Sequence, residues 1–370
     1  MASPHLLMTA DAVGGVWQYA TDLAQILARH GIRTTMVVLG PSPSPEQANA
    51  IRRIPDLTMI ESGLPLEWLA SDGAEIIDTQ RRLATLVREI APDLVQLNAP
   101  ALLGDEPLGV PVVVVAHSCV ATWWATVGDG PMPDNLSEAA RLHRRGLELA
   151  DHVVVPSAAF AALTQEVHQI ARPSVVHNGR SFEAGEGTAL HDFAFTAGRL
   201  WDQGKNIRTL DEVAGQLAIP FRAAGALQGP NGERIDLQNL YALGQLDETE
   251  LARHFRACPV FVSASLYEPF GLAVLEAASA GCPLILSDIP TFRELWDDAA
   301  IFVPARSVLE FTEVIEDLVG DTSLRLELGR KAQKRAASYG PEAMAQRMMV
   351  IYEKLGLKCP SWPASPRAAA

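Results

Sequence analysis

The chain has 370 residues, with 30 Lys and Arg against 44 Asp and Glu, which gives a formal net charge of −14. This acidic balance excludes nucleic-acid binding through a basic surface and disfavours a broadly basic membrane-docking face, although a local patch for peripheral membrane contact stays open. The hydrophobic content of 48% is enough to fill the cores of two domains of ordinary size.

The cysteines and the apolar runs predict a cytoplasmic protein. Four widely spaced cysteines lack any CxxC pair: Cys119, Cys258, Cys282 and Cys359. Such spacing is typical of reduced thiols and argues against a disulfide framework or a zinc site. No apolar run has the length of a membrane span, and the first residues lead into a short strand without a signal-peptide pattern.

Strand-like apolar runs alternate with helical patterns along the whole chain, which predicts an α/β fold with parallel sheets covered by helices. The expected strands are 5–10, 34–39, 57–61, 94–97, 112–116, 152–155, 175–176, 193–197, 221–224, 240–243, 260–262, 284–287 and 300–303. The expected helices are 15–30, 72–91, 134–150, 205–217, 247–256, 271–280, 290–297, 307–319, 321–338 and 341–355.

A stretch rich in Gly and charge, 178–187, predicts the boundary between two α/β halves. We therefore expect a first domain over 1–180 and a second domain over 181–340. A last helical segment, 341–358, and a Pro-, Ser- and Ala-rich flexible tail, 359–370, follow them.

Three features of the first domain suit ligand binding. Gly14 and Gly15 join the first strand to the first helix, where they allow close backbone approach to a phosphate or sugar. His117 ends the apolar strand 112–116. Trp123 and Trp124 lie in what reads as a Gly/Pro loop, where they either stack on a sugar or an apolar acceptor or simply pack.

In the second domain, Arg199 and Lys205 lie between the end of a strand and the start of a helix. Anions bind readily at such a place, because arginine offers a planar fork of donors and lysine a mobile point charge. As an isolated pair, however, they would be interpreted as two surface cations in a loop.

The segment from Glu268 to Glu276 holds two carboxylates eight residues apart. Glu268 stands in a Pro-Phe-Gly turn, and a helix is expected to open near Gly271 and to end at the Gly-Cys-Pro stop of 281–283. Glu276 falls in an otherwise apolar helix, where a charge needs a partner from elsewhere in the fold or from a ligand with hydroxyl groups. Roughly 7–8 Å of helix separates Gly271 from Glu276.

This segment resembles the signature of GT-B glycosyltransferases of the GT4 type, in which two Glu stand eight residues apart with Phe-Gly after the first. The resemblance implies two Rossmann-like β/α/β domains that face an interdomain cleft, the first for the acceptor and the second for the donor. It also implies that the last helix crosses back to the first domain. The segment 176–179 departs from the family pattern, since His177 stands where a proline is usual.

The resemblance also assigns roles to residues. Glu268 and His117 would act at the transferred sugar, while Glu276 would hold the nucleotide ribose. The expected donor-binding residues are Gly14, Gly15, Arg199, Lys205, Leu246, Phe270, Gly271, Leu272 and Glu276. Trp17, Trp123 and Trp124 are candidate acceptor contacts, and Trp17 equally suits the core.

The implied activity is retaining transfer of a hexose from a UDP- or GDP-linked sugar to an acceptor hydroxyl on a glycan, a lipid-linked sugar or a small metabolite. The nucleotide sugar is a co-substrate, and no resident cofactor is expected. With no Asp-x-Asp pair and no His/Cys cluster in the sequence, metal-independent chemistry is expected. A sugar-nucleotide epimerase of the same architecture and a non-enzymatic sugar-binding protein are the alternatives.

Overall fold

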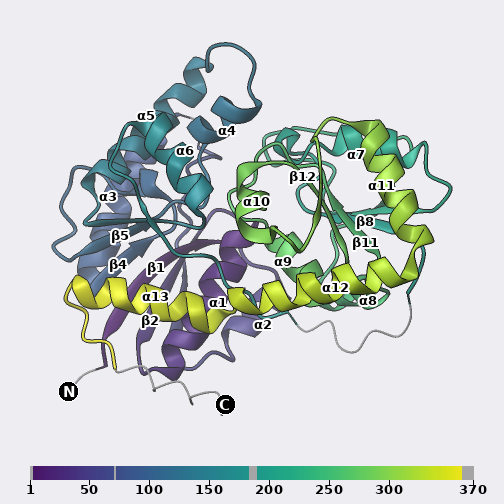
Figure 1. The fold of residues 1–370 in the computed structure, drawn as a ribbon. Helices are drawn as coiled ribbons and strands as arrows, with labels where there is room; N and C mark the ends of the chain where they lie inside the picture. Colours follow the sequence, from purple (N-terminus) through teal and green to yellow (C-terminus); the bar gives the residue numbers. More distant parts are fainter. Residues whose placement is uncertain (1–2, 71, 183–189, 361–370) are drawn as a thin grey trace.

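The computed structural model describes residues 3–70, 72–182 and 190–360, and its chain forms two α/β domains (Figure 1). The first domain holds a seven-stranded sheet in the order β3-β2-β1-β4-β5-β6-β7, and the second holds a six-stranded sheet in the order β10-β9-β8-β11-β12-β13. Neighbouring strands pair in parallel throughout both sheets. The predicted fold class is confirmed.

The elements of the first domain are β1 (His5–Asp11), α1 (Gly15–Arg29), β2 (Arg33–Leu39), α2 (Pro45–Ile51), β3 (Leu57–Glu61), α3 (Gly73–Ile90), β4 (Leu94–Leu97), the 3₁₀ helix η1 (Pro100–Leu102), β5 (Val112–Val115), α4 (Val120–Val127), α5 (Asp134–Leu149), β6 (His152–Val155), α6 (Ala158–His168) and β7 (Ser174–Val175).

The second domain and the crossing helix comprise β8 (Ala194–Ala197), η2 (Gln203–Lys205), α7 (Ile207–Ala214), β9 (Phe221–Ala224), β10 (Tyr241–Gly244), α8 (Glu248–Arg256), β11 (Val260–Ser263), α9 (Leu272–Ser279), β12 (Leu284–Ser287), α10 (Pro290–Trp296), β13 (Ile301–Val303), α11 (Val308–Gly320), α12 (Thr322–Ala336), η3 (Ala337–Tyr339) and α13 (Pro341–Lys354).

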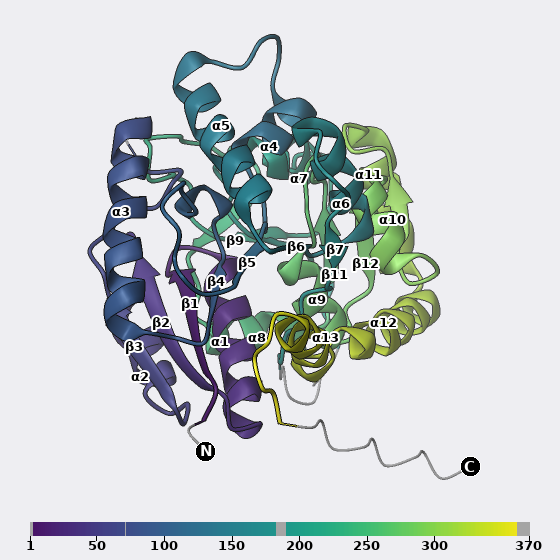
Figure 2. The same ribbon diagram turned by 90° about the vertical axis from the view of Figure 1, so that its left-hand side faces the viewer.

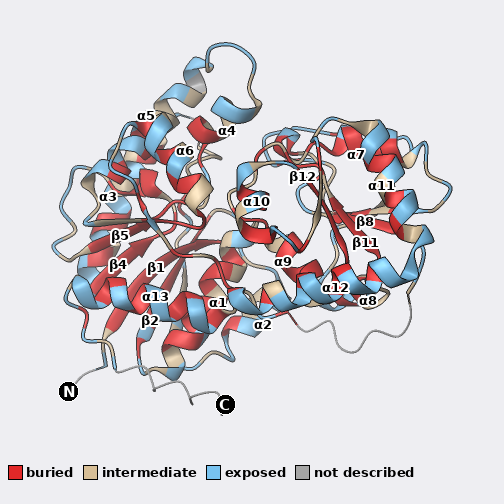
Figure 3. Ribbon diagram, in the orientation of Figure 1, coloured by how far each residue is buried: buried red, intermediate tan, exposed pale blue. Residues whose placement is uncertain are grey.

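The predicted strands all form within a residue or two, because their buried apolar runs have the pattern of parallel strands covered on both faces. Figure 3 shows both sheets as buried, with the exposed residues on the outer faces of the helices. Three helices were not predicted: α2, α4 and α6. The prediction of a loop around Trp123 and Trp124 is therefore wrong, since both residues belong to α4.

The helix α13 packs against the first domain, although it follows the second domain in sequence. Its Met344, Met348 and Tyr352 lie in the same hydrophobic cluster as Leu6 of β1 and Leu23 of α1. Figures 1 and 2 show α13 alongside α1, outside the sheet of the first domain.

The chain thus passes between the domains twice, and the two passing segments touch each other. The backbone N–H of Arg180 donates to the carbonyl of Tyr339 at 3.1 Å. A Cβ on Gly179 would lie 2.3 Å from the carbonyl oxygen of Gly340, so only glycine permits this approach. Residues 183–187 of the predicted boundary and residues 361–370 of the predicted tail lie outside the described residues.

Each sheet has a point where the strand order reverses, between β1 and β4 in the first and between β8 and β11 in the second. In open α/β sheets, ligands bind outside the carboxyl ends of the strands at such points. The loops that follow β1, β4, β8 and β11 are therefore the places to look for a site.

Candidate active site

Lys205 and Glu268 meet at the carboxyl edge of the second sheet. Lys205 ends η2, after β8, and Glu268 follows β11; the ammonium Nζ donates to the carboxylate Oε2. The two side chains are 19% and 13% exposed, so this pair is partly shielded from water. Without a ligand, each charge is thus neutralised by the other.

The helix α9 begins beside this pair. Gly271 is its N-cap with φ of 94°, a left-handed conformation that glycine adopts without strain. The helix opens at Leu272 and the strand β12 follows the Gly-Cys-Pro stop, as predicted. A helix N-terminus presents unpaired N–H groups and a positive dipole end, which suits an anion such as a diphosphate.

Arg199 lies in the loop between β8 and η2, and its side chain is 44% exposed. Its Nη2 donates to Oδ2 of Asp202 at 3.0 Å. The other oxygen of Asp202, Oδ1, accepts a 3.0 Å bond from the indole N–H of Trp123 in α4. Asp202 therefore ties the cationic loop of the second domain to a helix of the first.

Glu276 has a protein partner that the sequence did not reveal. Arg180 Nε donates to Glu276 Oε1 at 3.0 Å, Nη1 contacts Asp22 Oδ2 at 3.2 Å, and Nη2 contacts Glu248 Oε2 at 3.1 Å. The guanidinium side chain is 9% exposed. Burial raises the pKa of Glu276, and the Arg180 charge opposes that shift. The sequence predicted a partner for Glu276 from elsewhere in the fold or from a ligand, and the fold supplies Arg180.

The loop between β1 and α1 faces the start of α9. A Cβ on Gly15 would lie 2.9 Å from Cδ1 of Leu272, so Gly15 and Leu272, two of the predicted donor residues, are neighbours. A Cβ on Gly14 would meet nothing within 4 Å, which leaves open space beside it. The loop and the helix N-terminus thus approach from opposite domains.

His117 follows β5 on the first-domain side of this region. Its Nε2 lies 3.2 Å from Oδ1 of Asn98, the residue after β4, and its ring packs edge-on against Tyr19 at 4.5 Å between centroids. Asn98 Oδ1 also accepts from Gln96, so it acts as the acceptor and His117 carries its proton on Nε2. Burial lowers the pKa of His117, so the ring is neutral at pH 7 and Nδ1 is an acceptor.

Four predicted site residues have surroundings that limit what their side chains can contact. Trp17 is 4% exposed and belongs to the core, so it presents no face to an acceptor. Phe270 is 3% exposed and packs against Tyr339 at 5.8 Å, which leaves only its backbone for a donor. The indole N–H of Trp124 donates to the carbonyl of Gly130, in the loop that follows α4. Leu246 packs partly against the second-domain core.

A second contact links α4 to the site. Thr122 Oγ1 lies 2.8 Å from the hydroxyl of Tyr267, the residue before Glu268. Neither this pair nor Arg180 was predicted as part of the site. Both join residues more than 90 positions apart, so their proximity appears only in the fold.

Two family models match the chain. The model for glycosyltransferase family 4 matches residues 13–183, and the model for glycosyl transferases group 1 matches residues 235–335. The first match lies on the first domain and the second within the second domain. Together they cover the loop with Gly15, Glu268 and the whole of α9, but they do not cover Lys205.

Solved structures share the fold across nearly the whole chain. Sucrose-phosphate synthase from Thermosynechococcus elongatus superposes with a TM-score of 0.75 at 19% identity, covering 95% of this chain and 99% of that one. HepE from Anabaena, in complex with UDP and glucose, superposes with a TM-score of 0.72 at 16% identity and the same coverage. These two domains therefore adopt the GT-B fold.

Curated relatives match shorter stretches. A D-inositol 3-phosphate glycosyltransferase from Paenarthrobacter aurescens is 31% identical over 107 residues, which is 28% of this chain and 26% of that protein. One from Jonesia denitrificans is 26% identical over 308 residues, or 78% of this chain and 68% of that protein. In three of these relatives, the first among them, the matched stretch spans only 26–36% of the relative's own length.

This chain belongs to the GT4 family of glycosyltransferases. Among the residues that the structure describes, no helix combines the length and the apolar character needed to cross a bilayer.

Proposed function

We propose that this protein is a retaining glycosyltransferase that moves a hexose from a UDP- or GDP-linked sugar to an acceptor hydroxyl. The observation that carries the proposal is the grouping of Lys205, Glu268 and the N-terminus of α9 at the switch point of the second sheet. Arg199 extends the same edge, and family membership supports the reaction class.

The donor diphosphate would bind where these positive groups converge. Its negative charge would draw the Lys205 ammonium away from Glu268, and the helix N–H groups would hold its oxygens. The freed Glu268 carboxylate would then face the sugar, where it stabilises the positive charge that develops at the anomeric carbon. Ligand binding would thus exchange one ion pair for two separate interactions.

In the transfer step, the bond from the anomeric carbon to the diphosphate oxygen breaks. The bond from that carbon to the acceptor oxygen forms on the same face of the sugar. The acceptor proton passes to the departing diphosphate, whose charge Arg199 and Lys205 offset. This scheme uses no resident cofactor and no metal ion for the leaving group. His117, neutral and with Nδ1 as an acceptor, would take a hydrogen bond from a sugar hydroxyl.

Glu276 would hold the ribose. Arg180 bonds to its Oε1, and a carboxylate has a second oxygen that accepts hydroxyl hydrogen bonds. Burial raises the pKa of Glu276, and the Arg180 charge opposes that rise and so favours the ionised form that accepts hydrogen bonds.

The first domain would bind the acceptor, and the reaction would take place in the cytoplasm. The relatives named above act on D-inositol 3-phosphate by their names, and another relative is named for an undecaprenol-diphosphate-linked sugar. A phosphorylated polyol and a lipid-linked sugar are therefore the first acceptors to test. Asp11 and Asn98, at the carboxyl ends of β1 and β4, line a small pocket together with Glu67, and Asn98 lies 3.2 Å from His117.

The proposal is tested by variants of the charged groups. Lys205→Ala and Arg199→Ala together should reduce turnover by at least about 100-fold, because fixed charges at a developing oxyanion contribute several kcal/mol. Arg234→Ala, which removes a 70% exposed arginine of the same domain, is the matched control. A double variant with full activity would refute the phosphate role.

The anomeric configuration of the product, read by NMR, tests retention. Incubation with the donor alone separates transfer from epimerisation, because an epimerase converts the nucleotide sugar without any acceptor.

A further inference from the structure

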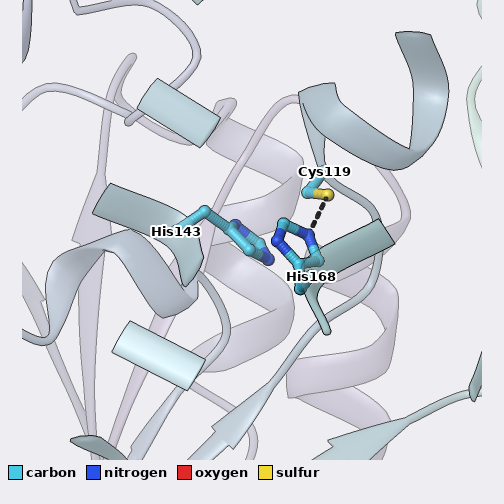
Figure 4. Close-up of side chains that lie close together, drawn as sticks. All are labelled: Cys119, His143 and His168. Atoms are coloured by element: carbon cyan, nitrogen blue, oxygen red, sulfur yellow. Dashed lines mark hydrogen bonds between the residues drawn. The ribbon is translucent and has the colours of Figure 1, made fainter. Parts of the chain in front are cut away.

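A cluster of Cys119, His143 and His168 lies inside the first domain (Figure 4). Cys119 caps α4, His143 lies on α5 and His168 ends α6. The three are 7%, 2% and 3% exposed, and one nitrogen or sulfur atom from each lies within 4.8 Å of the others. The expectation that histidine and cysteine side chains do not cluster is therefore wrong for the described residues.

The hydrogen bonding of this cluster is incomplete. Cys119 Sγ lies 3.2 Å from Nε2 of His168, but both ring nitrogens of His143 are buried without a hydrogen-bond partner. The two imidazole rings stack at 5.4 Å with an angle of 21° between their planes. A buried polar group without a partner is costly, so His143 calls for an explanation such as an absent ligand.

Glu67 supplies a second, independent sign of a metal site. Its Oε1 lies 3.5 Å from Nδ1 of His143. A histidine that ligates a metal through one ring nitrogen almost always directs the other at a carboxylate or carbonyl, which fixes the tautomer. Nδ1 of His143 faces Glu67, which leaves its unpartnered Nε2 as the atom available to an ion.

We propose that Cys119, His143 and His168 bind a borderline-soft divalent ion, with Zn²⁺ as the best fit. One thiolate and two imidazoles are ligands that Zn²⁺ takes, whereas Mg²⁺ and Ca²⁺ require oxygen ligands. Tetrahedral zinc places its sulfur and nitrogen ligands about 3.5 Å apart. The 3.2 Å and 4.8 Å limits of the cluster bracket that spacing, so small side-chain shifts would complete the site.

Metal binding at this site is a simple exchange of proton for metal. The Zn²⁺ ion takes the sulfur lone pair, the Cys119 S–H bond breaks, and the proton leaves to solvent. No oxidant or reductant is involved.

The site would join the start of α4, the middle of α5 and the end of α6, and so fix the position of α4. Two residues of α4, Thr122 and Trp123, contact Tyr267 and Asp202 of the second domain. The metal would therefore have a structural role, separate from the leaving-group chemistry and independent of the proposed reaction.

The first experiment measures metal content in the full-length protein, freed of any affinity tag and dialysed with Zn²⁺. Mass spectrometry of the elements should find about one zinc per chain. Loading with Co²⁺ after zinc removal should give a thiolate-to-cobalt charge-transfer absorption, which identifies the sulfur ligand.

Cys119→Ser and His143→Asn should each reduce zinc retention at least about 10-fold and remove that absorption. Serine is itself a good helix N-cap, so Cys119→Ser keeps the start of α4 intact. Cys359→Ser and His254→Asn, at sites outside the cluster, should bind metal as the wild type does.

The outcomes separate cleanly. Background zinc and no saturable cobalt spectrum in the wild-type protein would overturn the proposal and leave the cluster as a hydrogen-bonded part of the core. Zinc binding by Cys119→Ser as tight as that of the wild type would overturn it as well. The metal content of the wild-type protein alone can refute the proposal, so the test does not depend on every variant folding.

Discussion

Arg180 holds together charges that would otherwise be buried without compensation. One guanidinium contacts Asp22 of the first domain and Glu248 and Glu276 of the second. The side chains of Asp22 and Glu276 are only 8% and 11% exposed, whereas that of Glu248 is 63% exposed. Replacing Arg180 with alanine leaves two buried carboxylates facing each other across the domain boundary.

The expected loss follows from that burial. Removing one partner of a buried ion pair costs about 3–5 kcal/mol, because the remaining charge keeps its desolvation cost without its attraction. The rim contact with Glu248 adds at most about 1 kcal/mol. Arg180→Ala should therefore lower the free energy of unfolding by about 3–5 kcal/mol, which is a large share of the stability of most domains.

The assay is urea unfolding followed by fluorescence and circular dichroism, compared at the first transition because two domains need not unfold together. Adding Asp22→Asn and Glu276→Gln to Arg180→Ala should restore much of the loss, since neutral amides need no counter-charge. Arg234→Ala, at an exposed pair, should change stability by less than about 0.5 kcal/mol. A loss below about 1 kcal/mol, or a loss that the neutral partners do not relieve, would refute this reasoning.

Three further predictions concern the same region. Glu276→Ala should weaken nucleotide binding at least about 10-fold in calorimetry, and an unchanged affinity would remove the ribose role. Burial raises the pKa of Asp22 to about 6. The Arg180 charge lowers this pKa, and the charges of Glu248 and Glu276 raise it further. Because the folded state then holds this proton more tightly, Asp22 contributes stability that is present below about pH 4 and lost as pH rises through 6. Unfolding of Asp22→Asn should lack that loss, about 2 kcal/mol between pH 4.5 and 7.5, and an identical pH profile would contradict it. EDTA added briefly to the assay should leave transfer rates within about twofold, and a strict need for added Mg²⁺ or Mn²⁺ would show that a metal assists the leaving diphosphate.

Local patterns predicted the strands and most helices, because a buried parallel strand leaves a compact apolar run in the sequence. The helix α4 was missed for the opposite reason. Its eight residues are rich in β-branched and aromatic types, which have low helix propensity, and its N-cap is a cysteine rather than the usual Ser or Asp. Tertiary contacts from Thr122 and Trp123 stabilise a helix that propensity alone disfavours.

The site was predicted as far as its residues follow a shared motif. Lys205, Glu268 and Gly271 could be named from spacing and resemblance, and the structure brings the first two together. Arg180 follows the segment 176–179, which departs from the family pattern, so no motif identified it. Cys119, His143 and His168 are separated by 24 and 25 residues, and only the packing of α4, α5 and α6 makes them neighbours.

The close approach of Gly179 and Gly340 has a consequence for how the domains are joined. Since α13 returns to the first domain, the second domain is inserted in the first and is held by two chain segments that touch at these glycines. A Cβ at position 179 would force these two segments apart, so a side chain at this one position would disturb both connections between the domains.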